Sequence, residues 1–366
     1  MKNRHPFTGS YTPDDVQFLL KPMTLVDTPV HLKEALIQSG QKHYSQMLTH
    51  ESLPPPDYLP LFYRAMDLNQ YRMAEHLLLL AEGIITTRSQ GITLVSLARA
   101  GTPVGVLLKH ILKRHFNVDV KHFSISILRD VGIDQNALRY ILQNHTPESL
   151  VFVDGWTGKG VIARQLVTSL QAFAVSDGIF IPPELYVLTD LSGWAKVAAA
   201  SEDYLIPSCI LNATISGLVS RSVYDPHTAS STDFHGCVYY EQFAEHDLST
   251  YFIESLLEKV AVIRPTFGSG FIDHSSYCRQ LQTSSLAFLH WVAERYGISH
   301  HNYIKPGIGE ATRVLLRRKA QLLLLQNLDC EATQHLRWLA ESKSIPIAVF
   351  KDLQYRAVAL IKEIEL

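Results

Sequence analysis

Four short, almost uninterrupted apolar runs between residues 92 and 189 constrain the fold more than any other feature of the chain. They span residues 92–98, 122–128, 150–154 and 185–189, and each is followed by a turn and a longer helical stretch, such as 104–115 or 161–172. Strands without polar alternation, separated by helices, are typical of a parallel sheet covered on both faces. The sequence therefore predicts a doubly wound α/β core, with ligands binding beyond the carboxyl ends of the strands.

The length of 366 residues, 46% of them hydrophobic, suits one large domain and one small one. We expect a first domain over residues 1–298, divided into an N-terminal helical region (1–90, with helical spacing over 14–48 and 58–82), the α/β core (91–206), and an irregular hood with closing helices (207–298). A second α/β module is expected over residues 303–366, with helices at 309–318, 330–343 and 353–360 and strands at 320–325 and 347–350.

Charge and cysteine content exclude several classes of protein. The formal net charge is −2, so nucleic-acid binding must be regional. No apolar run is long enough to cross a membrane, and the N-terminus lacks the apolar stretch of a signal peptide, which predicts a cytoplasmic protein. Four widely spaced cysteines without a CxxC pair predict reduced, partly buried thiols, and the histidines form no metal-ligand motif.

The segment 150–160 ends a strand in Asp154 and continues into a turn that opens a helix. The turn consists of Thr157, Gly158, Lys159 and Gly160. Backbone N–H groups at a helix N-terminus converge on one point and favour a phosphate group there. The spacing is not that of a Walker A loop, and a tight glycine turn without a ligand is the alternative.

Two further strand ends carry candidate residues. The run that includes Ser96 ends at Arg99, Ala100 and Gly101, ahead of a helix, and a planar guanidinium group there suits phosphate oxygens. The neighbouring run ends at Arg129 and Asp130, which are candidates for a lid over the site, with an exposed charged turn as the alternative.

These strand ends resemble the type I phosphoribosyltransferases. The resemblance implies that Thr157 to Gly160 hold a 5′-phosphate, that Asp154 contacts the ribose, and that Ser96, Arg99, Ala100 and Gly101 receive pyrophosphate, with Arg129 capping the site. It also implies Mg²⁺ held mainly by the substrate's diphosphate and water. Gly155 stands where the family usually has a second acid.

Longer stretches resemble one branch, the StiP-type proteins of tellurium-resistance and stress operons. They are residues 9–21, 216–222 and 233–236, and the resemblance runs through nearly all of residues 1–298. The branch has also been labelled a predicted cysteine protease. Cys237 lies near His235 and Asp233, but neighbours in sequence seldom form a triad. We therefore place Arg221, Asp233 and His235 in a hood over an acceptor base, with a buried structural role as the alternative for His235.

The C-terminal module carries a concentration of basic residues beside a glycine pair. Cationic side chains and main-chain N–H groups at a helix N-terminus suit an RNA backbone. Residues 303–366 resemble the PELOTA RNA-binding domain, and a solvated helix face or a docking surface for the first domain is the alternative. The predicted RNA-contacting residues are Lys305, Gly307, Gly309, Glu310, Arg313, Arg317 and Lys319.

Together these features favour a Mg²⁺-dependent phosphoribosyltransferase in a tellurium or stress response. Its predicted catalytic residues are Asp154, Arg99 and Arg129. The expected partners are phosphoribosyl pyrophosphate or a nucleotide, an unknown nitrogenous acceptor, and structured RNA, with a homodimer also possible. The main alternative, favoured by Gly155, is a non-catalytic nucleotide sensor that binds structured RNA. Base exchange on RNA is a third hypothesis, and a cysteine protease is a minor alternative.

Overall fold

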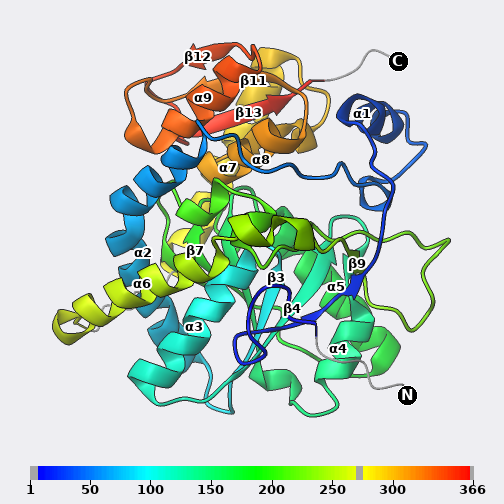
Figure 1. Ribbon diagram of the computed structural model, residues 1–366, viewed down its shortest axis with the longest axis vertical. Helices are drawn as coiled ribbons and strands as arrows, with labels where there is room; N and C mark the ends of the chain where they lie inside the picture. Colours follow the sequence, from blue (N-terminus) through cyan, green and yellow to red (C-terminus); the bar gives the residue numbers. More distant parts are fainter. Residues whose placement is uncertain (1–6, 269–274, 363–366) are drawn as a thin grey trace.

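A computed structural model, which describes residues 7–268 and 275–362, shows a large α/β core with a smaller α/β domain above it (Figure 1). The core sheet has seven strands, six of them parallel in the order β1-β4-β3-β6-β7-β8, and β5 pairs with β4 in the antiparallel sense. Its strands are β1 (Gln17–Leu19), β3 (Thr93–Ala98), β4 (Lys121–Leu128), β5 (Gly132–Ile133), β6 (Leu150–Thr157), β7 (Leu185–Asp190) and β8 (Val197–Ala200). The four apolar runs form β3, β4, β6 and β7, which confirms an α/β core.

Helices cover both faces of this sheet. One face packs against α2 (Leu59–Thr87), α3 (Gly101–Phe116) and α6 (Ser249–Ile263). The other packs against α4 (Gln135–Ile141) and α5 (Val161–Asp177). Burial on both faces explains why the strands lack polar alternation.

The first fifty residues are less helical than predicted. Its described part, residues 7–50, contains one α-helix, α1 (Val30–Gln38), whereas residues 17–19 form β1 and residues 21–22 form β2 (Lys21–Pro22). β1 pairs with β4 at the edge of the core sheet, and β2 pairs with β9 (Gly236–Cys237). The prediction of helix over 14–48 was wrong there because strand pairing, which the local spacing does not encode, determines the backbone conformation.

The C-terminal domain is a four-stranded sheet in the order β10-β13-β11-β12. Its strands are β10 (Ile304–Pro306), β11 (Ala320–Leu325), β12 (Ile347–Val349) and β13 (Ala357–Ile361), and its helices are α8 (Ile308–Arg317) and α9 (Gln334–Ser342). The helix predicted over 353–360 is wrong, because half of that range belongs to β13 and the rest is not helical. This strand lies between β10 and β11 and every residue in it is buried, so its sequence shows no period of two.

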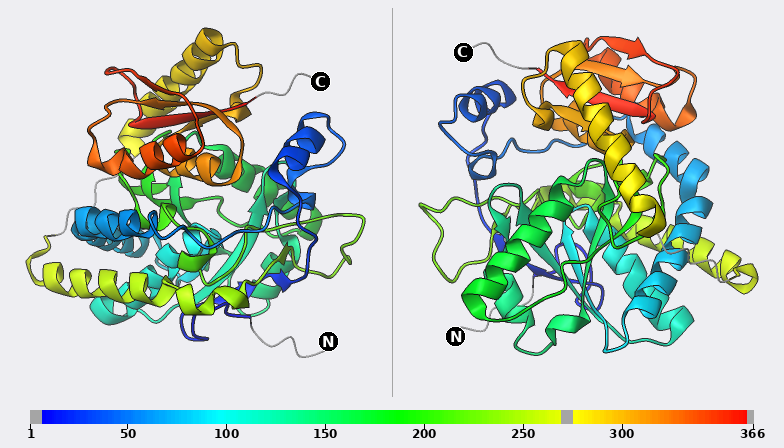
Figure 2. Two further views of the ribbon diagram at one scale, coloured as in Figure 1. Left: turned by 45° about the horizontal axis from the view of Figure 1, so that its top comes forward. Right: turned by 180° about the vertical axis from the view of Figure 1, so that it is seen from behind.

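Helix α7 (Ser275–Tyr296) joins the two domains (Figure 2). We expected it to close the first domain, but Phe288, Leu289 and Val292 form one apolar cluster with the C-terminal sheet. The other face of that sheet carries α8 and α9, whose apolar residues merge with the cluster of the core. The domains therefore share an apolar interface.

Glycines allow close approach at this interface. A Cβ on Gly309 would lie 2.4 Å from Cε2 of Trp156, and one on Gly158 would lie 2.6 Å from the carbonyl oxygen of Pro306. The amide of Ile308, at the start of α8, donates to Oδ1 of Asp203 in the core at 2.9 Å. The N-terminus of α8 is thus fitted against the core. Among the described residues, no helix is both long and apolar enough to cross a membrane.

Candidate functional site

The carboxyl ends of β3, β4, β6 and β7 face the C-terminal domain, and two adjoining cavities lie at this junction. The smaller, about 220 Å³, is lined by Asp154, Thr157 to Gly160 and Arg129 of the core and by residues of β10 and α8. The larger, about 620 Å³, extends toward α1 and α9. The structure therefore brings the predicted phosphate loop together with residues that the sequence assigned to a separate RNA interface.

The predicted phosphate loop contacts the C-terminal domain. The ammonium group of Lys159 donates to the carbonyl oxygens of Ile304 at 2.6 Å and His301 at 2.5 Å. The hydroxyl of Thr157 accepts from the Gly160 amide at 3.0 Å and bonds the Ser192 hydroxyl at 2.9 Å. Lys159 is buried, and burial lowers its pKa well below the usual value. In this arrangement the loop holds β10 in place.

Asp154 lies in the smaller cavity as expected for a strand-end acid. Its carboxylate accepts from the amide of Gly155 at 2.8 Å, and burial raises its pKa to about 6. Arg129 lines the same cavity, where Nε donates to Asp130 at 2.9 Å and the guanidinium group lies over the ring of Tyr44. Both predicted residues therefore border a cavity that faces the C-terminal domain.

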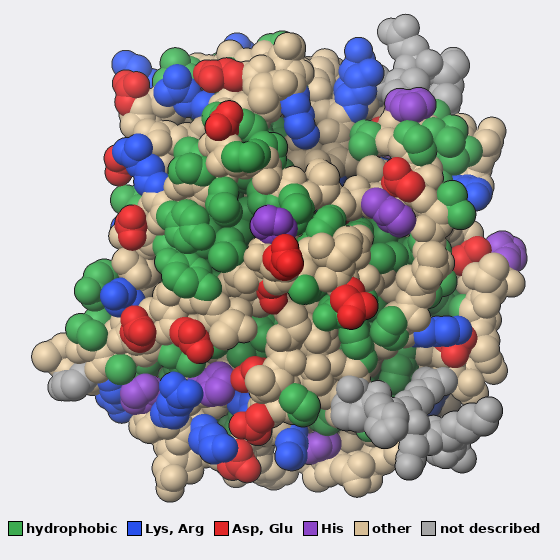
Figure 3. Space-filling model, viewed as in Figure 1, with side chains coloured by type: hydrophobic (Ala, Val, Ile, Leu, Met, Phe, Trp, Pro, Cys, Tyr) green, Lys and Arg blue, Asp and Glu red, His purple; other side chains and the backbone are tan. Residues whose placement is uncertain are grey.

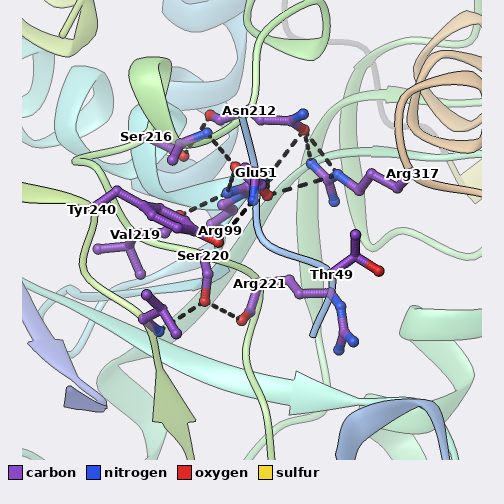
Figure 4. A network of polar contacts seen from close by, with 12 residues as sticks. Thr49, Glu51, Arg99, Asn212, Ser216, Val219, Ser220, Arg221, Tyr240 and Arg317 are labelled. Carbon is purple, nitrogen blue, oxygen red and sulfur yellow. Dashed lines mark hydrogen bonds and ion pairs between the residues drawn. The ribbon is translucent and has the colours of Figure 1, made fainter. Parts of the chain in front are cut away.

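Arg99 is held by a buried carboxylate that the sequence analysis did not identify. Figure 4 shows Glu51 at the centre of a polar network, where it accepts from both terminal nitrogens of Arg99 at 2.7 and 2.9 Å. Arg99 also donates to Val219 O at 2.7 Å and to Asn212 Oδ1 at 3.1 Å. These bonds use both terminal nitrogens, so Arg99 cross-links segments of the chain instead of presenting its fork to a ligand.

Asn212 extends this network into the C-terminal domain. Its Oδ1 also accepts from Nε of Arg317 at 2.8 Å, and Arg317 lies 3.9 Å from the Glu51 carboxylate. Burial lowers the pKa of Arg317 well below its ordinary value. One buried network thus connects the core to α8.

The residues predicted to form a hood do not converge. Arg221 lines the larger cavity and donates to the carbonyl oxygen of Tyr44 at 2.8 Å. Asp233 pairs with Lys21 at 2.7 Å. Nδ1 of His235 forms a hydrogen bond with the hydroxyl of Ser126 at 2.9 Å. This is the buried structural role that we gave as the alternative for His235.

Two residues of the predicted pyrophosphate loop are internal to the core. Ser96 is buried and its hydroxyl bonds Nε2 of His122 at 2.7 Å. A Cβ on Gly101 would lie 2.3 Å from the carbonyl oxygen of Val153, so this glycine lets α3 begin against β6. Ala100 borders a small cavity with Arg99 and Cys209.

Most of the residues predicted to contact RNA face the core. Gly307, at a φ of +91°, packs against Leu191, and Arg313 lies over the ring of Trp156 at 4.6 Å. Lys305 and Glu310 line both cavities, whereas Lys319 is exposed. The sequence analysis gave a docking surface for the first domain as the alternative, and these residues lie where that alternative puts them. An RNA-contacting role for them stays a prediction.

On the face seen in Figure 3, Lys and Arg side chains are interspersed with Asp and Glu and form no continuous basic surface. The basic residues named above gather instead at the junction of the two domains. Any RNA contact through α8 therefore requires this junction to open.

All four thiols are free. Cys209 and Cys237 are buried, and burial raises the pKa of each thiol to about 12. The sulfur of Cys209 lies 3.9 Å from the Thr312 hydroxyl of α8, which in turn bonds Nε2 of His335 at 2.8 Å. Cys278 and Cys330 are half-buried. Cys209 is therefore a core thiol covered by the C-terminal domain.

His335 and His122 are buried in the neutral form, and burial lowers the pKa of each to about 3. Between pH 6.5 and 3 the unfolded chain takes up protons that the folded chain does not, so stability decreases as the pH falls, by about 1.4 kcal/mol per pH unit for each group. We expect His335→Gln to reduce this slope. Urea unfolding from pH 6.5 down to about 4 measures it, and an unchanged slope contradicts the assignment.

No group of three or more His, Cys, Asp or Glu side chains that could hold a metal ion is found in the described part of the chain. Binding of Mg²⁺ through a substrate stays a prediction.

Sequence reasoning missed Glu51, Lys33 and Asn212. Glu51 precedes a proline run and Lys33 lies in a short helix with mixed polarity, so neither has a motif. A buried charge is apparent only once its partners, which lie far away in sequence, are in place. No local signal would have identified these residues.

Comparison with known proteins adds three findings. A family model described as "Tellurite-like stress resistance cysteine protease StiP" matches residues 9–257, and one described as "PELOTA RNA binding domain" matches residues 283–363. A relative from Acinetobacter baylyi (strain ATCC 33305 / BD413 / ADP1), named "Cysteine protease StiP", is 40% identical over 370 residues, which cover 98% of this chain and 95% of the relative.

These findings overturn the phosphoribosyltransferase prediction. Both the family model and the relative carry the description of a cysteine protease, which the sequence analysis kept only as a minor alternative. The geometry gives a physical reason for the correction, because Arg99 is paired with Glu51 and Lys159 donates to β10 and its preceding turn. The residues at the strand ends indicated the α/β scaffold correctly, but they did not indicate the chemistry of the protein.

Proposed function

This chain belongs to the StiP family, and from that premise we propose that it is a cysteine protease that acts in stress resistance. The observation that carries the proposal is the 40% identity, over 98% of the chain, to a relative named as such a protease. We also propose that its α/β scaffold is of the type I phosphoribosyltransferase kind, which the acid and glycine turn at the end of β6 support.

We assign the nucleophile to Cys209. The part of the chain matched by the StiP model, residues 9–257, contains two cysteines, Cys209 and Cys237. Cys237 is buried on β9, which pairs with β2, and it lines neither of the two junction cavities. Cys209 lies at the domain junction, and the residues that follow it line the larger cavity. A peptide that enters the opened domain junction would lie next to this thiol.

The arrangement of Cys209 corresponds to a closed form of such an enzyme. A cysteine protease attacks with its thiolate, and a thiol with a pKa near 12 is neutral at pH 7. Because Thr312 of α8 covers the sulfur, movement of the C-terminal domain would open the site. The thiolate then attacks the peptide carbonyl to form a thioester, and the amine leaves with the proton that the thiol gave up. Water hydrolyses the thioester, which releases the carboxylic acid and restores the thiol.

Cleavage of an unfolded substrate such as labelled casein tests this assignment. We expect Cys209→Ser to lose cleavage to background, because the serine hydroxyl is a far weaker nucleophile. Cys237→Ser is the matched control, since that thiol is equally buried and has a similar pKa, and it should retain activity. Alkylation by iodoacetamide, located by mass spectrometry, gives a second readout.

Two results would contradict the assignment. Loss of cleavage in Cys278→Ser with full activity in Cys209→Ser would move the nucleophile to α7 and leave the protease class intact. Absence of cleavage by the wild type and by a variant whose C-terminal domain is released from the core would remove the protease proposal itself.

We propose RNA binding as a second function, because residues 283–363 match the PELOTA RNA-binding domain. The predicted contact residues of α8 face the core, so the closed form would bind RNA weakly. Release of this domain is expected to free both α8 and Cys209. Binding of structured RNA by the wild type and by a released variant tests this proposal.

A further inference from the structure

The larger cavity at the domain junction has no role in the arguments above beyond its position beside Cys209. It is enclosed by α1, the segments 44–55 and 210–214, α8 and α9, and its volume is about 620 Å³. It adjoins the smaller cavity through six shared residues: Tyr44, Ile162, Lys305, Glu310, Arg313 and Arg318. This volume is within the range of small-molecule sites.

Positive charge dominates the larger cavity. Seven Lys and Arg side chains line it, against two Glu side chains. One of these two glutamates, Glu51, is already paired with Arg99. Among the cations, Arg318 is paired with Glu34 of α1, which does not line the cavity. The cavity therefore holds more cations than its carboxylates neutralise.

Five of the cations have no carboxylate within 4.0 Å among the described residues, namely Lys33, Arg221, Lys305, Arg313 and Lys343. Lys33 donates to Thr49 at 2.8 Å, Arg221 donates to main-chain carbonyls, and Arg313 lies over Trp156. The half-buried ammonium group of Lys305 has no hydrogen-bond partner in the described part of the chain, although it lines both cavities.

These cations destabilise one another. Burial and the nearby Arg221 and Arg318 lower the pKa of Lys33 to about 8. Burial also lowers the pKa of Arg221 to about 10. Burial lowers the pKa of Lys305 too; the Glu310 carboxylate offsets part of this effect, and Arg129, Arg318 and Arg313 add to it. Buried charges are normally paired, so a cluster of this kind lacks an anion. A multiply charged anion would supply several missing hydrogen bonds at once.

Aromatic side chains also border the larger cavity. Tyr58 and Trp338 form its wall with ring centroids 5.1 Å apart, and Phe243 borders it as well. The hydroxyl of Tyr58 is satisfied by the carbonyl oxygen of Ile210 at 3.0 Å. Aromatic faces of this kind stack on planar rings. A ligand that makes use of both the cations and the aromatic side chains has an anionic group and a planar ring.

We propose that this cavity binds a ligand with a di- or triphosphate group attached to a planar base. The phosphates would lie against Lys305, Arg313 and Lys33, and the base would lie toward Tyr58 and Trp338. Two sources carry this chemistry: a free nucleoside triphosphate and the 5′-triphosphate end of an RNA. Because the ligand would contact both domains, it favours their docked arrangement. The proposal involves binding alone and is independent of the identity of the protease nucleophile.

Titration calorimetry on the full chain tests the proposal with tripolyphosphate and ATP as probes. We expect both to bind, ATP more tightly, and Lys305→Met to weaken each by at least about tenfold, because an ammonium–phosphate contact is lost. Methionine fills similar space and removes an unpartnered charge, so the variant should unfold at no lower temperature than the wild type. The matched control is Lys319→Met at an exposed position of the same domain, with affinities within about twofold.

The source of the triphosphate is identified with one RNA prepared with a 5′-triphosphate and with a 5′-hydroxyl. Preference for the triphosphate form that Lys305→Met removes supports an RNA end, and tight ATP binding without that preference supports a free nucleotide. The proposal is overturned if neither tripolyphosphate nor ATP binds the wild type, or if both lysine variants weaken binding equally. Cys209→Ser should bind ATP as the wild type does, so failure of the protease assignment leaves this test unaffected.

Discussion

Glu51→Gln is expected to lower the free energy of unfolding by about 3–5 kcal/mol, the usual result of removing one partner of a buried ion pair. The Glu51 carboxylate accepts from both terminal nitrogens of Arg99 and from the amide of Ala213 at 2.9 Å. Glutamine has the same shape but no charge, so the buried Arg99 and the nearby Arg317 lose their counter-charge. Two adjacent guanidinium groups would then remain in a desolvated interface.

The pH dependence of this effect follows from the pKa of Glu51. Burial by itself would raise this pKa, but Arg99 and Arg317 outweigh burial and hold it below the usual value for a glutamate. The carboxylate therefore contributes stability above the pKa of the unfolded chain, and this contribution is lost as the pH falls through the folded value. The difference in the free energy of unfolding between the wild type and Glu51→Gln should therefore become smaller as the pH falls through the pKa of Glu51.

Chemical unfolding of both proteins measures the effect of Glu51→Gln. The matched control is Glu331→Gln, which removes the exposed ion pair of Glu331 with Arg64 at 2.6 Å and should change stability by at most about 1 kcal/mol. If Glu51→Gln costs no more than this control, the network of Figure 4 does not hold the segments together as described.

Gly309→Val is expected to release the C-terminal domain from the core. The new Cβ would lie 2.4 Å from Cε2 of Trp156, and Trp156 cannot withdraw freely because Arg313 lies over its ring. Overpacking of this kind costs about 1–3 kcal/mol. The docked face of α8 covers Cys209 through Thr312. Release of the domain therefore makes both this face of α8 and the Cys209 thiol accessible. We expect iodoacetamide to label Cys209 at least about tenfold faster, because burial now limits its reaction.

The same variant tests whether α8 contacts RNA. With α8 freed, its basic side chains can reach a phosphate backbone, and affinity for a structured RNA should rise by at least about tenfold, with a strong dependence on salt. Gly268→Val is the matched control, because a Cβ there meets nothing within 4 Å. Unchanged labelling together with unchanged RNA affinity would show that docking controls neither site.

The sequence analysis placed the strand-end residues correctly in the fold, but the reaction that it inferred from them was wrong. The runs that became β3 and β6 placed Arg99, Asp154 and the turn after Thr157 at one edge of a sheet, and the structure has them there. The ligand inferred from them was wrong, because a residue type at a strand end does not reveal what already contacts it. For Arg99 that contact is Glu51, which lies 48 residues earlier in the chain.

Hydrophobic patterning by itself determined the α/β class of the core, the main strands and helices, and the presence of a second α/β module, because burial on one or two faces leaves a local record in the sequence. The tertiary structure alone decided that residues 17–22 and 357–361 form strands, that the glycine pair of α8 faces the core, and that Lys33, Arg221 and Lys305 share one cavity. Strand pairing, domain docking and charge clustering join residues far apart in the chain, and their energies depend on a geometry that local sequence does not specify.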